Sequence, residues 1–527
     1  MAEGVVQLDR LTAAGVRDGA LDGTAVTVLG LARSGIALAR FFADAGARVT
    51  VYDGRPAGEL AAAISSLGDR AVELRLGPEV DPASTWARAD LIATSPSINP
   101  DFPTAEPRLR SALQAVVAAH RADPAGSPAL VSETDLVLRM CPCPTIGVTG
   151  TKGKTTTSSL AAALLAGDPA HPAILGGNIG IPLVERLPEL TPHHRVVIEL
   201  SELQMPTLSR GTTVAVYTNV TADHLDRHGS LEAYRKVKRR LAELVDPRGA
   251  LVLNADDPVV SEYAALGTAR VVMYSRGTPM AGCVGVVDGW IVAAGVARLE
   301  VAGGGVAAGS DGRILPVAEL AIPGEHNVSN ALAAVSAALL FGVAPDVIRR
   351  AAAEFPGVEH RLEQVAIVDG VRFVNDSQGT QPDAVIAALR SFSRPLVLIA
   401  GGRDKGVDLS VLAPVAAERA DAAVLIGESG PSLAAMFRAS GMTAVETATS
   451  LEAAVDRADE IARELLAGGA AAGRAGAAGP ATAPATVLLS PAAASFDMFV
   501  DYAARGRAFR AAAAAIAERR RAGDPAR

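Results

Sequence analysis

Short apolar runs alternate with longer amphipathic stretches along the chain, and this pattern is typical of an α/β protein. Near the N-terminus, an apolar run at residues 25–29 is followed by a glycine turn, an amphipathic stretch at 36–45 and a second apolar run at 48–52. The two short apolar runs predict strands, and the amphipathic stretch between them predicts a helix. We therefore expect a strand–helix–strand unit at the start of the chain.

The same alternation returns in the last third of the chain. Apolar runs predict strands at residues 372–375, 395–400, 422–426 and 486–489, with helical stretches between them. A tract of Ala, Gly, Pro and Thr at residues 467–485 has no apolar periodicity. We expect an open α/β domain here, with that tract as a mobile surface insertion.

Length and composition support this organisation. The chain has 527 residues, of which 49% are hydrophobic and only 4% aromatic, and at the usual ~150 residues each it has room for about three domains. Low aromatic content with many Ala, Val and Leu favours α/β layers over a β-sandwich. The predicted fold class is α/β in three domains: a Rossmann-like N-terminal domain (1–140), a central P-loop ATPase-like domain with a mostly parallel sheet (141–355) and a Rossmann-like C-terminal domain (356–527).

Charge and composition also exclude some partners. The net charge of -8 offers no broad basic field for nucleic acid. The chain contains no basic and apolar leader and no uninterrupted 18-residue apolar stretch, so we expect no membrane insertion and a cytoplasmic location. Three cysteines cannot build a disulfide framework, and we interpret them as reduced thiols.

The candidate chemistry begins at residues 147–157, whose sequence GVTGTKGKTTT lies between an apolar run and an alanine-rich helical stretch. Gly150 and Gly153 would let backbone N–H groups approach phosphate oxygens, Lys154 would neutralise the β and γ phosphates, and the Thr155 hydroxyl would bind Mg²⁺. Val148 stands where the common pattern has glycine, so this is a variant of the motif. It predicts a nucleoside triphosphate site.

A weaker nucleotide signal lies in the first strand–helix–strand unit. The turn GLARSG at residues 30–35 is followed by Asp53, about 20 positions on, as in a dinucleotide fingerprint. The turn has two glycines where the fingerprint has three. An ordinary strand-end cap explains Asp53 equally well.

A lysine inside an apolar stripe is the third signal. Residues 231–245 predict a helix whose apolar face runs through Leu231, Tyr234 and Leu241, and Lys238 projects onto that same face. An interior lysine must be paired, deprotonated or chemically modified, unless its chain snorkels toward the helix end. Glu199 and His224 follow apolar runs nearby in the sequence, and with a phosphate loop they predict ligands for Mg²⁺.

At this point the chain resembles the ATP-dependent Mur ligases, most closely their glutamate-adding branch. The likeness covers nearly the whole chain and rests on motifs in order. These are GLARSG at Gly30, GTKGKTT at Gly150, GGNIG at Gly176, ELSELQ at Glu199, DHLDRH at Asp223, GEHNVSNALAA at Gly324, EHR at Glu359, NDSQGT at Asn375, GGRDKG at Gly401 and LSPAAASFD at Leu489.

The resemblance implies a cytoplasmic enzyme that uses ATP to join glutamate to the L-alanine carboxyl of UDP-N-acetylmuramoyl-L-alanine in peptidoglycan precursor synthesis. It implies an acyl-phosphate intermediate and a monomer. The first domain would hold the UDP portion, the middle domain ATP, and the last domain the incoming amino acid.

The resemblance also assigns roles to residues of this chain. Nucleotide contacts would come from Gly150, Thr151, Lys152, Gly153, Lys154, Thr155, Thr156, Asn330, Arg361 and Asp376. Substrate contacts would come from Arg33, Ser34, Asp53, Arg55, Asn178, Ser201, Gln204, His224, Thr380, Lys405, Ser495, Phe496 and Tyr502. Two Mg²⁺ ions would be bound by Thr155, Glu199, His224 and Lys238, with Lys238 carbamylated by CO₂, and Lys154, Glu199, His224 and Lys238 would be catalytic.

Three alternatives remain open. Gln378 replaces a lysine of the family's DSKAT segment, and a related subgroup adds L-glutamate, so the stereochemistry of the amino acid is undecided. A folylpolyglutamate synthase-like ligase shares the fold, although GLARSG and LSPAAASFD favour the glutamate-adding branch. A noncatalytic nucleotide sensor is the third, and it should have lost Lys154, Glu199 or His224, all of which are present. By sequence alone, Lys405, Phe496 and Tyr502 could also be an ordinary loop lysine and core aromatics.

Overall fold

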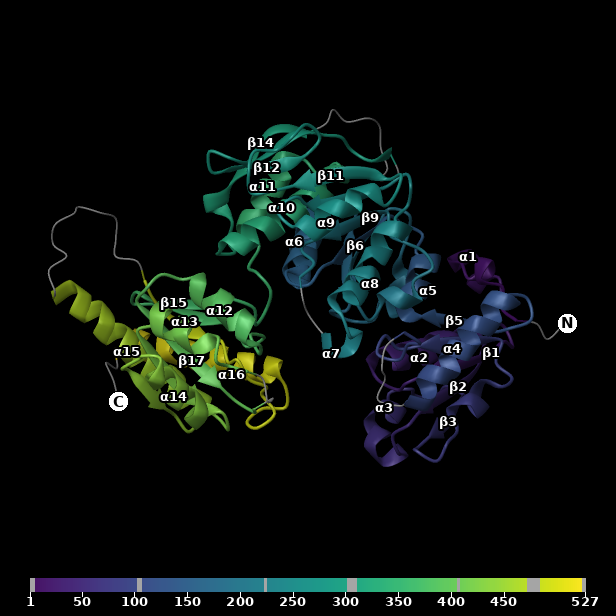
Figure 1. The fold of residues 1–527 in the computed structure, drawn as a ribbon, viewed down its shortest axis with the longest axis horizontal. Helices are drawn as coiled ribbons and strands as arrows, with labels where there is room; N and C mark the ends of the chain where they lie inside the picture. The colour runs from purple at the N-terminus through teal and green to yellow at the C-terminus, as the bar shows by residue number, and fades with distance from the viewer. Residues whose placement is uncertain are drawn as a thin grey trace. The chain divides into compact units, whose positions relative to one another are not determined.

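The structure is a computed structural model that describes residues 5–101, 107–221, 225–300, 310–404, 408–471 and 484–523. The chain divides into two compact units (Figure 1). The first unit contains residues 1–320 and 328–353, and the second contains residues 321–327 and 354–527. The domain boundaries expected at residues 140 and 355 stay predictions.

The N-terminal sheet of the first unit is parallel, with strand order β3-β2-β1-β4-β5. Its strands are β1 (Ala25–Leu29), β2 (Arg48–Asp53), β3 (Val72–Leu76), β4 (Leu91–Thr94) and β5 (Ala129–Ser132). The helices of this part are α1 (Ala13–Arg17), α2 (Arg33–Asp44), α3 (Ala61–Ser65), α4 (Pro107–Ala122) and α5 (Glu133–Met140). The strand–helix–strand unit expected at the start of the chain is therefore present as β1, α2 and β2.

Helix α2 begins earlier than the sequence suggests. Arg33 and Ser34, expected in the glycine turn, form the first turn of the helix, and Gly35 lies inside it. A Cβ at Gly35 would lie 1.7 Å from the carbonyl oxygen of Gly30. Gly35 therefore serves close packing between the helix and the turn rather than ending the turn.

The larger sheet of the first unit has strand order β14-β13-β12-β11-β10-β9-β6-β8-β7. Pairing is parallel from β12 to β7 and antiparallel along β12, β13 and β14. The strands are β6 (Thr145–Thr149), β7 (Ala173–Gly177), β8 (Arg195–Glu199), β9 (Val214–Tyr217), β10 (Ala250–Asn254), β11 (Arg270–Tyr274), β12 (Val284–Val287), β13 (Trp290–Val296) and β14 (Ser310–Pro316). The helices are α6 (Lys154–Ala166), α7 (Leu225–His228), α8 (Leu231–Leu244), α9 (Pro258–Glu262), α10 (Glu325–Leu340), which continues from the second unit, and α11 (Pro345–Glu354).

This strand order explains where a site can form. Strands β7, β8, β6 and β9 are consecutive neighbours and run parallel, so their carboxyl ends meet at one edge. The loops that follow these four strands therefore come together there, as ligand-binding loops do in open α/β sheets.

The second unit carries a sheet of order β15-β16-β20-β17-β18-β19, in which only the β15–β16 pair is antiparallel among the described strands. The strands are β15 (Glu363–Val368), β16 (Val371–Asn375), β17 (Leu396–Gly401), β18 (Ala422–Ile426), β19 (Val445–Thr447) and β20 (Ala485–Leu489). The helices are α12 (Pro382–Arg390), α13 (Leu412–Arg419), α14 (Gly430–Ala439), α15 (Leu451–Ala471) and α16 (Tyr502–Arg521). Within the described ranges, no helix of either unit is both long enough and apolar enough to pass through a bilayer.

Both faces of this third sheet are covered by helices. Alternate residues such as Leu398 and Leu425 pack with α12, α13 and α14 on one face. Their neighbours, such as Ile399 and Val424, pack with α15 and α16 on the other. The two-residue period of the strands thus builds two separate hydrophobic layers, which is the arrangement of a doubly wound α/β domain.

The tract at residues 467–485 is only partly an irregular segment. Helix α15 continues through Ala471, and β20 begins at Ala485. The first five residues of the tract, Ala-Gly-Gly-Ala-Ala, therefore continue α15 although two of them are glycine, since adding a residue to an existing helix costs less than starting one. The mobility expected for the tract stays a prediction. Residues 472–483 lie outside the described residues.

Both tryptophans of the chain belong to the first unit. Trp86 is 7% exposed and packs in a small apolar cluster against β4 and α4. Trp290 begins β13, and the guanidinium carbons of Arg313 and Arg349 lie 5.0 and 5.7 Å from its ring centroid. The indole of Trp290 is thus held by cation–π contacts rather than by a core.

Candidate active site

The phosphate loop connects β6 to α6 and depends on two glycines. Gly150 has a φ of 149°, and Gly153, at the N-cap of α6, has a φ of 86°. A Cβ at Gly150 would lie 1.9 Å from Thr218 Oγ1, and one at Gly153 would lie 2.3 Å from Asn330 Oδ1. Backbone conformation and close packing therefore both require glycine at these two positions.

Lys154 folds back over the loop that precedes it. Its Nζ donates to the carbonyl oxygens of Gly150 at 3.1 Å and Thr151 at 2.9 Å. The ammonium charge therefore lies against the loop, at the N-terminal end of α6. Positive charge, glycine backbone and a helix N-terminus are together the usual elements of a phosphate site.

The other predicted loop residues differ in exposure. Thr151 and Thr156 are buried, Thr155 is half-buried, and Lys152 is exposed. Asn330, on α10, is 6% exposed, and its Oδ1 accepts a hydrogen bond from Thr157 Oγ1 at 3.2 Å. This hydrogen bond connects Asn330 to α6, the helix that follows the phosphate loop.

Glu199 ends β8 beside this loop, and one of its oxygens lacks a partner. The residue is 1% exposed; Oε1 accepts a hydrogen bond from Asn178 Nδ2 at 2.9 Å, while Oε2 is buried with no hydrogen-bond partner among the described residues. A buried carboxylate oxygen without a partner is unfavourable, and a hard cation is its natural complement. The Glu199 carboxylate therefore fits a divalent-metal ligand.

Lys238 lies inside the protein, as the helix projection predicts. It is 0% exposed on α8, whereas Lys236 on the opposite face is exposed. Lys238 Nζ donates to Thr149 Oγ1 at 3.3 Å and to the Gly150 carbonyl at 3.1 Å, and it lies 5.6 Å from the Tyr234 ring centroid. Full burial excludes snorkelling and places the amine at the base of the phosphate loop.

The predicted metal set is only partly visible. His224 lies outside the described residues, and no group of three or more His, Cys, Asp or Glu side chains suited to a metal occurs among the residues that are described. Thr155, Glu199 and Lys238 belong to elements that meet at one sheet edge. Their joint role as metal ligands stays a prediction.

The glycine turn of the N-terminal sheet is closed by Asp53. Its carboxylate accepts hydrogen bonds from the Leu31 N–H at 2.8 Å and from the Arg55 guanidinium at 2.8 and 3.0 Å. Burial alone would raise the pKa of Asp53, but the hydrogen bonds from Arg55 and Leu31 together hold that pKa below its ordinary value. The strand-end cap is thus observed, and a ligand contact by Asp53 or Arg55 stays a prediction.

Arg33 links this turn to the loop after β7. Its Nη1 donates to the Gly180 carbonyl at 2.8 Å, and the side chain is exposed. Ser34, the next residue, is half-buried. Because Asn178 lies in the same loop as Gly180 and bonds Glu199, the predicted UDP-side and phosphate-side residues are connected within one unit.

Ser201 and Gln204 bond each other. Gln204 Oε1 accepts from the Ser201 N–H at 2.9 Å and from Ser201 Oγ at 3.1 Å, and Gln204 Nε2 donates to Thr134 Oγ1 at 2.9 Å. Both side chains are buried. Their visible role is to shape the loop after Glu199, and direct substrate contact stays a prediction.

In the second unit, Asp376 is buried at the carboxyl end of β16. Its oxygens accept hydrogen bonds from the Leu362 N–H at 3.2 Å and from Ser490 Oγ at 2.6 Å. Burial raises the pKa of Asp376 from 3.8 to about 7, against the lowering effect of Ser490 and nearby Arg361. Arg361 and Asp376 are therefore brought close, as two predicted nucleotide contacts.

Among the described residues, those expected around glutamate lie after β16, after β20 and at the start of α16. Thr380 is half-buried after β16, and Ser495 is 3% exposed after β20. Phe496 is 65% exposed and Tyr502 is 42% exposed, so neither is a core aromatic. Lys405 lies outside the described residues.

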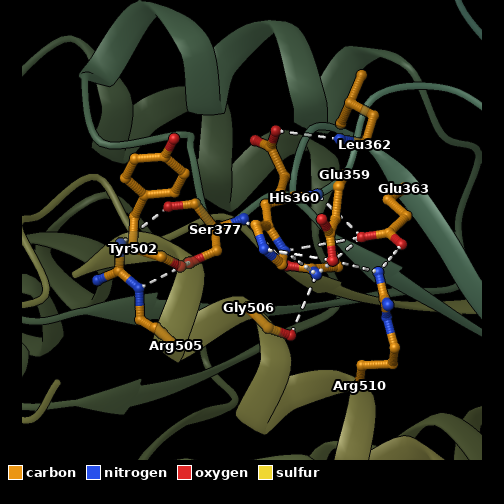
Figure 2. Close-up of polar contacts among 11 residues, drawn as sticks. Glu359, His360, Leu362, Glu363, Ser377, Tyr502, Arg505, Gly506 and Arg510 are labelled. Atoms are coloured by element: carbon orange, nitrogen blue, oxygen red, sulfur yellow. Dashed lines mark hydrogen bonds and ion pairs between the residues drawn. The ribbon is translucent and has the colours of Figure 1, made fainter. Parts of the chain in front are cut away.

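Sequence reasoning did not single out three residues that organise these loops. They are His360 and Arg505, labelled in Figure 2, and Asn375, whose Nδ2 lies 3.0 Å from His360 Nδ1. His360 and Asn375 lie within the motifs EHR and NDSQGT, where the quoted neighbours drew the attention. Arg505 is 1% exposed in alanine-rich α16, whose composition shows no apolar stripe to mark an interior face.

Sequence comparisons cover the same elements in the same order. Residues 24–120 match the "Mur ligase MurD-like, N-terminal domain", residues 148–338 the "Mur ligase middle domain", and residues 360–468 the "Mur ligase, glutamate ligase domain". The chain is 36% identical over 494 residues to the UDP-N-acetylmuramoylalanine--D-glutamate ligase of Symbiobacterium thermophilum, covering 93% of this chain and 97% of that protein. The chain belongs to the Mur ligase family.

Other Mur ligases extend the comparison. The UDP-N-acetylmuramoylalanine--D-glutamate ligase of Pelotomaculum thermopropionicum is 37% identical over 492 residues, or 92% of this chain and 96% of the relative. Among solved structures, MurF from Acinetobacter baumannii aligns with a TM-score of 0.54 at 15% identity, over 96% of this chain and 98% of that one. The structural likeness bears on the fold alone, and it confirms the predicted α/β class.

Proposed function

We propose that this protein is an ATP-dependent ligase that adds D-glutamate to UDP-N-acetylmuramoyl-L-alanine through an acyl phosphate, in peptidoglycan precursor synthesis. The observation that carries the proposal is the similarity of more than nine-tenths of the chain to two relatives that bear this activity in their names. The glutamate-adding ligase expected from the sequence is the function these relatives support. Nothing in them favours the folylpolyglutamate or sensor alternatives.

The first unit would bind the triphosphate. Gly150, Gly153 and the start of α6 offer backbone N–H groups, and Lys154 offers a positive charge held by its own loop. In this proposal Lys154 neutralises the γ-phosphate as the alanine carboxylate attacks it. The substrate carboxylate gains a phosphoryl group, ADP leaves, and the glutamate amine then displaces phosphate to form the amide.

Bringing two anions together needs more positive charge than Lys154 supplies. Like charges at ~4 Å repel by about 4 kcal/mol at an effective dielectric near 20. Thr155 and the unpartnered Oε2 of Glu199 fit Mg²⁺ ligands, and we include His224 and Lys238 in the set. Two bound Mg²⁺ ions would supply the charge that neutralises phosphate and carboxylate oxygens.

Carbamylation would convert Lys238 from a donor into a ligand. The neutral Nζ attacks CO₂, an N–C bond forms, and one proton leaves, so that an anionic carbamate replaces the amine. Support comes from the full burial of Lys238, 3.1 Å from the Gly150 carbonyl. An interior amine at a phosphate site gains from such a change because a carbamate offers oxygen to metal.

The UDP portion would be held by Arg33, Ser34, Asp53 and Arg55, and the muramoyl portion by Asn178, Ser201, Gln204 and His224. The second unit would receive glutamate through Thr380, Lys405, Ser495, Phe496 and Tyr502. The exposure of Phe496 and Tyr502 supports this assignment, because aromatic side chains without a core role are suited to cover a ligand. We place the reaction in the cytoplasm, where its nucleotide substrates occur, and a monomer stays a prediction.

The test is phosphate release from ATP with UDP-N-acetylmuramoyl-L-alanine and a single amino acid at a time. D-glutamate, L-glutamate, L-lysine and L-alanine are offered separately. We expect release with D-glutamate only. Release with L-glutamate alone would assign the chain to the L-adding type, consistent with Gln378, and equal release without any amino acid would point to a plain NTPase.

A further inference from the structure

A buried arginine on α16 joins the two loops that are expected to bind glutamate. Arg505 Nε donates to Ser377 Oγ at 3.0 Å, and its Nη2 donates to the Ser377 carbonyl at 2.9 Å (Figure 2). Its Nη1 donates to the Ala494 carbonyl at 3.2 Å. Both Nη atoms also lie 3.3 Å from the Ala493 carbonyl. The planar guanidinium therefore donates hydrogen bonds to both the segment after β16 and the segment after β20.

The guanidinium of Arg505 donates to one hydroxyl and three backbone carbonyls, and the nearby carboxylate of Asp497 raises its pKa against the larger effect of burial. Burial lowers the pKa of Arg505 to about 10, so the guanidinium stays charged at neutral pH. A side chain that served only to anchor α16 would be less unfavourable if it were apolar. We therefore look for the role of the Arg505 charge in the two loops whose carbonyl groups it binds.

The next residue, Gly506, makes the second contact. A Cβ at Gly506 would lie 2.2 Å from His360 Nδ1, and its carbonyl accepts a hydrogen bond from Asn375 Nδ2 at 3.2 Å. Asn375 Nδ2 also lies 3.0 Å from His360 Nδ1, and the His360 side chain is 4% exposed. The glycine thus lets α16 approach a buried ring that cannot move aside freely.

His360 and Asn375 also neighbour Arg361 and Asp376, the two residues of this unit that are expected to contact the nucleotide. His360 has a φ of 64° and Leu362 a φ of 46°, so Arg361 lies between two residues in the left-handed region. Such backbone persists only where neighbours enforce it. Asn375 immediately precedes Asp376, whose Oδ1 accepts from the Leu362 N–H.

We propose that Arg505 and Gly506 are positioning residues with separate tasks: Arg505 sets the two glutamate loops, and Gly506 sets the segment that presents Arg361 and Asp376 to the nucleotide. The inference rests on the proposed function. Neither residue touches a reacting atom, and each acts through the loops that it contacts.

The experiment measures KM for D-glutamate and for ATP, and melting temperature, on full-length variants. Arg505→Lys keeps the charge but loses the planar fork, and Ser377→Ala removes one acceptor of that fork. For both variants we expect the glutamate KM to rise about tenfold, as for the loss of one charge-assisted hydrogen bond, with the ATP KM unchanged.

Gly506→Ala gives the opposite pattern. The added methyl group displaces His360, and we expect the ATP KM to rise about tenfold while the glutamate KM stays unchanged. If Gly506→Ala does not fold, His360→Gln tests the same contact without added bulk at the helix, and we expect the same direction.

Arg195→Lys is the matched control. Arg195 is also 1% exposed and donates to a backbone carbonyl, that of Phe341, but it lies in the first unit and forms an ion pair with Asp168 at 3.2 Å. We expect it to lower the melting temperature and leave both KM values unchanged.

Several results would overturn the inference. If Arg505→Lys and Gly506→Ala change both KM values equally, or lower the melting temperature without changing either, the two residues are only structural. An inactive unaltered chain would remove the proposed function and this inference with it. An active unaltered chain whose Arg505→Lys variant keeps its glutamate KM would remove the inference alone.

Discussion

Single residues show both the reach and the limit of sequence reasoning. The interior position of Lys238 follows from the helix period alone, because an apolar stripe fixes one face of α8. The bond between Glu199 and Asn178 joins the ends of two different strands, and it needs the register of β7 against β8. The local sequence pattern therefore predicted that Lys238 is buried. The unpartnered oxygen of Glu199 could be recognised only from the three-dimensional fold.

Lys238→Ala should nearly abolish turnover. The substitution removes the only group that can carry a carbamate at this position, so added bicarbonate should not restore phosphate release. Lys236→Ala, on the exposed face of the same helix, is the control and should retain activity. Near-normal release by Lys238→Ala would exclude the lysine from the mechanism.

Asp376 should make stability depend on pH. Its pKa is raised from 3.8 to about 7 by burial, so between these pH values the folded chain holds a proton that the unfolded chain has released. The free energy of unfolding contributed by this group therefore falls as pH rises from about 4 to about 7 and is constant above that. Melting of the second unit, followed by calorimetry from pH 5 to 8 without ligand, should show this decline in the unaltered chain and a shallower one in Asp376→Asn.

At the scale of elements, strands were predicted better than helix limits. The runs at residues 25–29 and 422–426 agree with β1 and β18, because buried parallel strands are continuous apolar runs. The start of α2 was misplaced because Gly35 acts there through close packing, and α15 extends into the Ala/Gly tract, where no apolar period marks a helix. The loops of the site depend on which strands are neighbours, which no local pattern states.

A substitution at Gly153 tests whether the loop between β6 and α6 needs glycine to bind ATP. Gly153→Ala forces a φ of 86° on alanine and drives its Cβ against Asn330. A strain of this kind costs about 1–3 kcal/mol, so kcat/KM for ATP should fall about tenfold or more. Gly289→Ala has a similar φ of 73° with open space around the Cβ, and it should leave kcat/KM unchanged.

At the scale of the whole molecule, two units with separate cores should melt separately. Each unit has its own hydrophobic clusters, and such units often unfold as independent cooperative blocks. Calorimetry should therefore resolve two transitions. Phe437, 0% exposed on α14, belongs to the second unit alone.

Phe437→Ala should move only one of the two transitions. Removal of a buried phenyl group costs about 3–5 kcal/mol, which corresponds to a lower midpoint by about 10 °C for a unit of this size. The other transition should keep its temperature. A single transition that shifts as a whole would show that the units unfold together.

The location of the two tryptophans decides which part of this chain tryptophan fluorescence can monitor. Trp86 and Trp290 both belong to residues 1–320, and the polypeptide has no third tryptophan. Tryptophan emission will therefore record the opening of the first unit and not that of the second. A compound that stabilises only the second unit would go undetected in a screen by tryptophan fluorescence, unless a tryptophan were first introduced there.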